Sequence, residues 1–211
     1  YNEGQVIADV VTQVKSVFPH VVCVDDGSSD NSAAMARSAG AVVIQHPINL
    51  GQGAALQTGF DFALTDPAMT DVVTFDADGQ HSVEDAQGMV ELRRSQKIDV
   101  VVGSRFLDTR TQLGPIKRAV LKVAAFYTRF STGMSLTDAH NGLRVINRET
   151  LLRFRLKQNR MAHASEIVDV FSSLKVTWAE YPTHIVYSAY SKAKGQSLLN
   201  SINILVELLF K

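Results

Sequence analysis

Residues 71–81 read Asp71-Val72-Val73-Thr74-Phe75-Asp76-Ala77-Asp78-Gly79-Gln80-His81, an apolar segment that ends in closely spaced carboxylates. The continuous apolar character of its first half predicts a strand over residues 71–76 with both faces covered. Side chains alternate along an extended chain, so we expect Asp76 and Asp78 to project to the same side of the strand end.

Two carboxylates this close repel each other unless a cation lies between them. Their oxygens, with the side-chain amide oxygen of Gln80, suit Mg²⁺ or Mn²⁺, and the diphosphate of a ligand would complete the coordination. The same residues also fit an acidic turn that caps the following helix, for which Gly79 and Ser82 are suitable. The motif alone leaves both interpretations open.

Apolar, β-branched runs bounded by turn residues predict three more strands in the first half of the chain, at residues 20–25, 41–45 and 98–103. Helical patterns alternate with these strands, at residues 5–17, 29–39, 53–64 and 82–96. This alternation is typical of an α/β fold, so we expect three layers with a mostly parallel central sheet.

The regular alternation ends at Gly103. The pattern then predicts a basic loop at 104–120, helices at 116–131 and 165–173, strands at 142–147 and 175–182, and a polar segment at 187–197. Residues 197–210 place leucine and isoleucine mostly on one side of a helix. The sequence contains no internal repeat and no low-complexity linker, which favours a single domain over residues 1–211.

Composition excludes several classes of protein. The 211 residues include 21 Lys and Arg against 21 Asp and Glu, so the chain lacks the basic surplus of a nucleic-acid-binding protein. Apolar residues make up 45% and charged residues 20%, which indicates a globular protein rather than a disordered chain or a coiled coil. The single cysteine, Cys23, favours a reducing, cytoplasmic setting. No run of about 18 apolar residues occurs, so we expect neither a membrane-spanning helix nor a secretion signal.

A second predicted strand end is also acidic. Asp25 and Asp26 follow an apolar run and precede Gly27, Ser28, Ser29 and Asp30. Ligands of open α/β sheets bind beyond the carboxyl ends of the strands, so we expect the two acidic strand ends to face one crevice. Capping of the next helix by Ser29 or Asp30 is compatible with this role.

Other motifs are weaker. The glycine-containing segment Asn49–Gly59 lacks the spacing of a dinucleotide fingerprint or a phosphate loop, so we expect close backbone packing there. Four cations in predicted loops are either phosphate ligands or solvated surface charges: Arg105, Arg118, Lys192 and Lys194. The sequence has no His-x-x-x-His zinc pattern and no Gly-x-Ser-x-Gly elbow, which excludes zinc proteases and serine hydrolases of those types.

The order of the motifs carries more information than any one of them. They are Tyr1-Asn2-Glu3, Asp25–Asp30, Asn49–Ala55, Asp76–His81, Gly103-Ser104-Arg105, Asp138–Gly142 and Lys192–Ser197. As an ordered set they resemble the family 2 glycosyltransferases of GT-A fold, in particular the polyprenyl-phosphate sugar transferases that are similar to dolichyl-phosphate mannose synthase. The resemblance covers nearly the whole chain and implies a Rossmann-like GT-A domain.

The resemblance also implies roles for the donor side of the site. Tyr1, Glu3 and Asp26 would contact the nucleoside of a UDP- or GDP-sugar. Asp76 and Asp78 would be the Asp-x-Asp pair that positions the ribose, the diphosphate and a Mg²⁺ or Mn²⁺ ion, with Gln80 as a further metal ligand.

Basic residues would face the donor and acceptor phosphates, and the residues implied for this role are Arg105, Arg118, Lys192, Lys194 and the adjacent Ser197. The expected catalytic set is Asp76, Asp78, Arg105 and Arg118. Gln52 stands where the family often has Lys, which bears on the sugar and the acceptor. The family also has a strand before the Tyr-Asn-Glu motif, and we expect this sequence to lack that strand and any C-terminal membrane segment.

The implied reaction is an inverting displacement, in which an anionic polyprenyl phosphate attacks the anomeric carbon and needs no general base. The protein would then work at the inner face of the cell membrane, with residues 197–211 as a candidate membrane contact. Two alternatives stay open. A related transferase acting on a sugar hydroxyl would need a base such as Glu166 or Asp169, and a nucleotide-sugar-binding module would bind without turnover.

Overall fold

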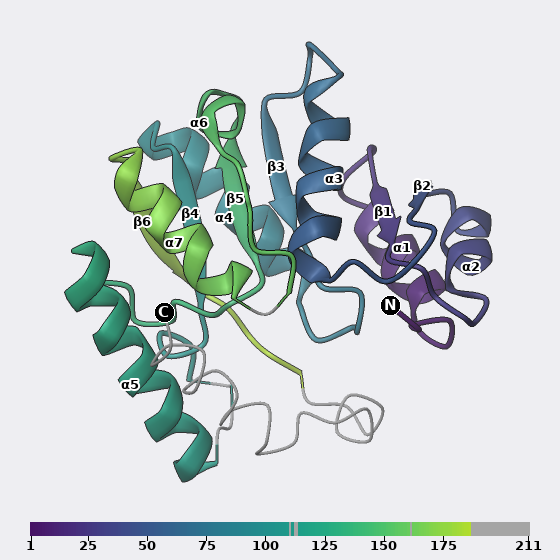
Figure 1. The fold of residues 1–211 in the computed structure, drawn as a ribbon. Helices are drawn as coiled ribbons and strands as arrows, with labels where there is room; N and C mark the ends of the chain where they lie inside the picture. The colour runs from purple at the N-terminus through teal and green to yellow at the C-terminus, as the bar shows by residue number, and fades with distance from the viewer. Residues whose placement is uncertain (110, 112–113, 161, 187–211) are drawn as a thin grey trace.

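The computed structural model describes residues 1–109, 111, 114–160 and 162–186 (Figure 1). Strands and helices alternate along the first half of the chain, as the apolar pattern predicts. In chain order the elements are α1 (Ile7–Lys15), β1 (Val22–Asp25), α2 (Ser32–Ser38), β2 (Val42–Gln45), α3 (Gln52–Leu64), β3 (Asp71–Thr74), α4 (Val83–Gln96), β4 (Val100–Ser104), α5 (Pro115–Thr132), β5 (Arg144–Asn147), α6 (Arg148–Arg153), α7 (His163–Ser173) and β6 (Trp178–Pro182).

The strands and helices predicted within the described ranges are all present, with ends displaced by a few residues. The unpredicted α6 begins after Asn147, whose side chain accepts a hydrogen bond from the Thr150 N–H at 2.8 Å. A helix of six residues is too short to show a helical period in the sequence. The expected helical tail at 197–210 and the polar segment at 187–197 lie outside the described residues.

Backbone ladders join the strands into two groups. β1 pairs with β2 in parallel, and the second group has the order β3-β5-β4-β6. β5 is antiparallel to β3 and to β4, whereas β6 is parallel to β4. Within the second group β3, β4 and β6 therefore run in one direction and β5 runs against them. The α/β fold with a mostly parallel sheet is confirmed.

The two groups meet at a cavity. In the described part of the chain, β1 and β3 each pair with one strand only and are not joined to each other. Val22 and Val24 of β1 and Val72 and Val73 of β3 line one cavity of about 1140 Å³. The expected single sheet is thus present as two hydrogen-bonded pieces with an apolar space between them.

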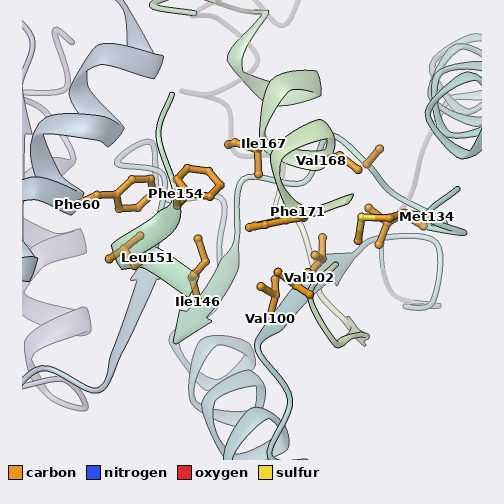
Figure 2. Close-up of a cluster of buried hydrophobic side chains, with 13 residues drawn as sticks. Phe60, Val100, Val102, Met134, Ile146, Leu151, Phe154, Ile167, Val168 and Phe171 are labelled. Carbon is orange, nitrogen blue, oxygen red and sulfur yellow. The ribbon is translucent and has the colours of Figure 1, made fainter. Parts of the chain in front are cut away.

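Side chains pack on both faces of the four-stranded group. On one face Val100 and Val102 of β4 lie in a cluster with Phe154 and Phe171 (Figure 2). On the other face Val101 packs in a cluster that contains residues of α4: Ala86, Met89 and Val90. This two-sided burial is the physical reason for the continuous apolar runs in the sequence. In the ranges that the structure describes, no helix is both long and apolar enough to cross a membrane.

Candidate active site

The carboxyl ends of β1 and β3 open onto the same cavity. Its lining includes the acidic residues Asp26, Asp76 and Asp78, and also Tyr1, Glu3, Gln80 and Arg105. The sequence predicted that the two acidic strand ends would converge, and the structure places them around one space.

Asp76 is held by one side chain from the turn that follows it and one from α3. Its Oδ2 lies 3.0 Å from His81 Nε2 and its Oδ1 accepts a hydrogen bond of 3.2 Å from Gln52 Nε2. Burial by itself raises the pKa of the Asp76 carboxyl, but the His81 hydrogen bond and the nearby charges of His81 and Arg144 bring that pKa below its ordinary value. Asp76 is therefore a fixed carboxylate at neutral pH.

The pKa of the Asp78 carboxyl is shifted in the opposite direction. Burial, followed by the charge of Asp76, raises the pKa of the Asp78 carboxyl above its ordinary value. Its Oδ1 accepts a hydrogen bond of 3.1 Å from the Gln80 N–H, which closes the turn after β3. The turn-and-cap interpretation of the acidic motif is confirmed, because Asp78 closes the turn and Ser82 caps α4 by accepting from the Asp85 N–H.

Two neighbouring carboxylates, one of them destabilised by the charge of the other, are a donor set that a divalent cation would stabilise. Oxygen ligands fit Mg²⁺ or Mn²⁺. In the described part of the chain, no group of three or more His, Cys, Asp or Glu side chains is arranged to hold a metal. Asp76 and Asp78 would consequently need oxygens from a ligand, such as a diphosphate, to complete the coordination.

The segment that follows Asp138 approaches Asp76 closely. A Cβ atom at Gly142 would lie 2.2 Å from Asp76 Oδ2, a distance at which atoms collide. Only glycine allows the backbone to pass so near this carboxylate. The motif Asp138–Gly142 is therefore part of the wall of the site.

Asp26 fixes the glycine-containing loop. Its two oxygens accept hydrogen bonds from the Leu50 and Gly51 N–H groups at 2.9 and 2.7 Å, and His46 Nδ1 lies 2.7 Å from Oδ1. Burial alone raises the pKa of Asp26, but these hydrogen bonds outweigh it and the pKa lies below its ordinary value. Beyond this loop, a Cβ atom at Gly53 would lie 2.0 Å from the Gln158 carbonyl oxygen, so the expected close backbone packing is confirmed.

Arg105 is positioned by Asp138. The Arg105 N–H and Nε donate to Asp138 Oδ2 at 3.1 and 2.5 Å, and both side chains are largely buried. Arg105 lines the cavity, so the ion pair holds a guanidinium beside the acidic cluster.

Sequence reasoning missed a second buried cation, Arg144. It is 3% exposed, and burial lowers its pKa to about 10 although Asp76 and Asp138 act to raise it. An arginine within an otherwise apolar predicted strand is the signal that could have found it. Arg144 lines the same cavity, and the charges of both Asp76 and Asp138 act on it.

Some expected residues are not brought together with this cluster. Arg118 lies on α5 and lines a separate hollow of about 400 Å³ with Lys122, Phe106, Ala125 and Thr137. Lys192, Lys194 and Ser197 lie outside the described residues. Glu166 does not line the cavity, and its carboxylate accepts hydrogen bonds from the Lys157 and Gln158 N–H groups at 2.8–3.1 Å.

A family model described as glycosyl transferase family 2 matches residues 1–154 of this chain. The chain belongs to glycosyl transferase family 2. The resemblance inferred from the ordered motifs is confirmed, and the protein is a glycosyltransferase.

Three relatives are consistent with this assignment. The family 2 chain is 28% identical over 231 residues to a UDP-N-acetylglucosamine–dolichyl-phosphate N-acetylglucosaminyltransferase of Methanococcus voltae, covering 99% of this chain and 92% of that protein. It is 32% identical over 166 residues to a polyprenol monophosphomannose synthase of Mycolicibacterium smegmatis, covering 74% and 62%. A 30% identical protein of Methanocaldococcus jannaschii matches over 100% of this chain and 88% of its own length.

Solved structures show the same fold. Glucosyl-3-phosphoglycerate synthase of Mycobacterium tuberculosis, in a complex with Mn²⁺, UDP-glucose and phosphoglyceric acid, superposes with a TM-score of 0.69 at 19% identity, covering 99% of this chain and 75% of that one. The GT-A architecture expected for a family 2 glycosyltransferase is thus confirmed.

Proposed function

We propose that this glycosyltransferase moves a hexose from a UDP- or GDP-sugar to a polyprenyl phosphate, with inversion at the anomeric carbon, at the inner face of the cell membrane. The observation that carries the proposal is the convergence of Asp26, Asp76, Asp78 and Arg105 on one cavity. The names of the relatives from M. voltae and M. smegmatis, which specify dolichyl phosphate and polyprenol, support the acceptor class.

On the donor side, Asp76 and Asp78, with Gln80, would hold a Mg²⁺ or Mn²⁺ ion. When bound, such an ion neutralises charge on the diphosphate of the leaving nucleotide. Arg105, which is fixed by Asp138 and lines the same cavity, would donate to the same phosphate oxygens. Its interaction strengthens as the glycosidic oxygen gains charge, and this difference between ground state and transition state lowers the barrier. Tyr1, Glu3 and Asp26 complete the lining where the nucleoside would bind.

On the acceptor side, a polyprenyl phosphate is already anionic at neutral pH. Its oxygen attacks the anomeric carbon directly while the diphosphate leaves with the electron pair, so no proton has to be removed. Cations are needed only to dock the phosphate. We assign this docking to Arg118, whose hollow also contains Lys122, and to Lys192, Lys194 and Ser197.

A hydroxyl acceptor is the second candidate, and it would require a carboxylate base. Glu166 is engaged in holding the backbone at Lys157 and Gln158, which favours a structural role for it. Glu166→Gln separates the two reactions. With a phosphate acceptor we expect turnover to change less than about threefold, whereas a base for a hydroxyl acceptor contributes about 100-fold or more.

The space between β1 and β3 supports a proposal about architecture. The Asn2 N–H donates to Ser28 Oγ at 2.8 Å and the Glu3 N–H donates to Ser32 Oγ at 2.7 Å, so the start of the described chain lies beside the carboxyl end of β1. We propose that a segment preceding Tyr1 occupies the apolar part of the cavity, between Val22 and Val24 of β1 and Val72 and Val73 of β3, as a strand parallel to β1. With α1 as the crossover, this strand would complete one GT-A domain and leave the acidic part of the cavity open to the donor.

Transfer of radiolabelled sugar to a short polyprenyl phosphate tests the proposed function. We expect lipid-linked product to form from one of UDP-glucose and GDP-mannose, or from another UDP- or GDP-hexose, in the presence of Mn²⁺ and not in the presence of EDTA. Donor binding without transfer to any polyprenyl phosphate would favour a binding module, and transfer to a sugar hydroxyl would favour the second candidate.

A further inference from the structure

Helix α5 has an unusual distribution of side chains. Its buried face consists of one leucine and three smaller residues at helical spacing, namely Leu121, Ala124, Ala125 and Thr128. This face packs against α7, and α5 lies at the periphery of the described chain (Figure 1). Its exposed face carries larger apolar residues, with Phe126 72% and Phe130 85% exposed.

The exposed apolar residues share one side of the helix. Val123, Phe126, Tyr127 and Phe130 follow the spacing i, i+3, i+4, i+7, so they form a continuous stripe, which we call the aromatic stripe. A surface helix normally turns polar residues outward, and contiguous exposed apolar patches mark interaction sites. The aromatic stripe therefore needs a partner that removes it from water.

The charges of the same helix indicate what this partner is. The α5 sequence, PIKRAVLKVAAFYTRFST, contains Lys117, Arg118, Lys122 and Arg129 and no acidic residue, although the whole chain is neutral. Lys122 and Arg129 are exposed next to the stripe. An apolar stripe on a helix whose charged residues are all cations complements a surface with anionic groups above an apolar layer, and a bilayer with anionic lipids is such a surface.

We propose that α5 docks in the plane of an anionic bilayer, with Phe126 and Phe130 inserted at the boundary between headgroups and acyl chains. The inference concerns binding to the bilayer and not catalysis, but it agrees with the lipid acceptor of the proposed function. Arg118 and Lys122 line a hollow with Phe106, the residue that follows Arg105. Docking through α5 would place this hollow at the membrane surface, where a lipid phosphate can reach it.

Flotation with vesicles tests the proposal without any turnover. The full chain is mixed with vesicles of phosphatidylcholine alone or with about a third of phosphatidylglycerol. The double variant Phe126→Ser/Phe130→Ser is compared with Leu152→Ser, which alters an exposed residue of α6. We expect the double variant to partition at least about tenfold more weakly into anionic vesicles, and Leu152→Ser to match the wild type.

Charge-reversing substitutions give an independent test of the proposal. Lys122→Glu should weaken binding to anionic vesicles and leave the weak binding to neutral vesicles unchanged, whereas Lys97→Glu, at the exposed C-terminal end of α4, should have a smaller effect. Equal partitioning of the Phe double variant and the wild type would overturn the proposal. So would a loss of binding only on deletion of residues 197–211, or a concentration-dependent dimer that the double variant abolishes.

Turnover of a short polyprenyl phosphate in detergent is measured on the same proteins. Unchanged turnover in the Phe double variant, with an unchanged melting temperature, shows that its fold and site are intact. Weakened vesicle binding with normal turnover then supports docking through α5. An absence of turnover in the wild type counts against the proposed function and leaves the vesicle result interpretable by itself.

Discussion

Asp138 and Arg105 form a largely buried ion pair in which one carboxylate oxygen accepts from both the backbone N–H and the Nε of Arg105. The two residues are 33 positions apart in the sequence. This contact aims a guanidinium into the cavity that contains Asp76 and Asp78. The pair therefore links the segment after β4 to the segment before β5 at the wall of this cavity.

Loss of this ion pair should lower the rate of transfer. In Asp138→Asn the guanidinium keeps its charge but loses its ionic anchor, so we expect kcat to fall by about 10- to 100-fold. Steady-state kinetics with saturating donor measures the change. Asp99→Asn is the matched control, because Asp99 also accepts backbone and side-chain hydrogen bonds, from Thr177, but does not line the cavity. A comparable fall in kcat in both variants would contradict the positioning role.

The close approach of Gly142 to Asp76 predicts sensitivity to a single methyl group. Gly142→Ala would place a Cβ 2.2 Å from Asp76 Oδ2, so the carboxylate has to move. We expect the Mn²⁺-dependent affinity for the donor nucleotide to fall by at least about tenfold. Gly114→Ala provides the control, since a Cβ there meets nothing within 4 Å. Unchanged calorimetric affinity in Gly142→Ala would show that Asp76 does not depend on this contact.

His140 predicts a pH dependence of stability. Burial, which outweighs the charge of Asp138, lowers the pKa of His140 from 6.5 to about 4. Between these values the unfolded chain binds a proton that the folded chain does not, so the free energy of unfolding falls as the pH drops from about 6.5 to 4. The shift corresponds to at most about 3 kcal/mol. Urea unfolding at pH 6.5 and 4.5 should show a smaller loss in His140→Gln. An identical loss would assign the pH dependence to other groups.

The cavity between β1 and β3 predicts a change in hydrogen exchange. If a strand preceding Tyr1 occupies its apolar part, protein that carries this segment should exchange the amides of 22–25 and 71–74 at least about tenfold more slowly than the 211-residue chain. Residues 100–104 of β4, which is paired on both sides, are the internal control. Equal exchange at β1 and β3 with and without the segment would argue against the missing strand.

The sequence predicts the fold more completely than the site, for a physical reason. Strands buried on both faces have continuous apolar runs, so β1, β3 and β4 are visible locally. The acidic residues at the strand ends are also recognisable from the local sequence. By contrast, the contacts of Asp26 with His46 and of Arg105 with Asp138 join residues 20 and 33 positions apart, and no local pattern encodes them.

Three individual side chains also have surroundings that the local sequence does not predict. Arg144 lies in a predicted apolar strand and was missed, although its position near Asp76 makes it part of the site. Glu166 looks like a candidate base in the sequence, but it supports a loop through backbone N–H groups. Arg118 lies with Lys122 in a hollow of its own rather than in the acidic cavity, so the basic residues do not form one cluster in the part of the chain that is described.

The central claim is that Asp76 and Asp78 hold a divalent cation that binds the donor diphosphate. Calorimetric titration of UDP-glucose and GDP-mannose into the wild type and Asp78→Asn, each with Mn²⁺ or EDTA, tests it most directly. We expect Mn²⁺-dependent binding of at least one donor to the wild type and at least about tenfold weaker binding to Asp78→Asn. The melting temperature should not fall, because burial and the charge of Asp76 already raise the pKa of this carboxyl. A donor affinity that neither EDTA nor Asp78→Asn reduces below that of the wild type with Mn²⁺ would contradict the claim.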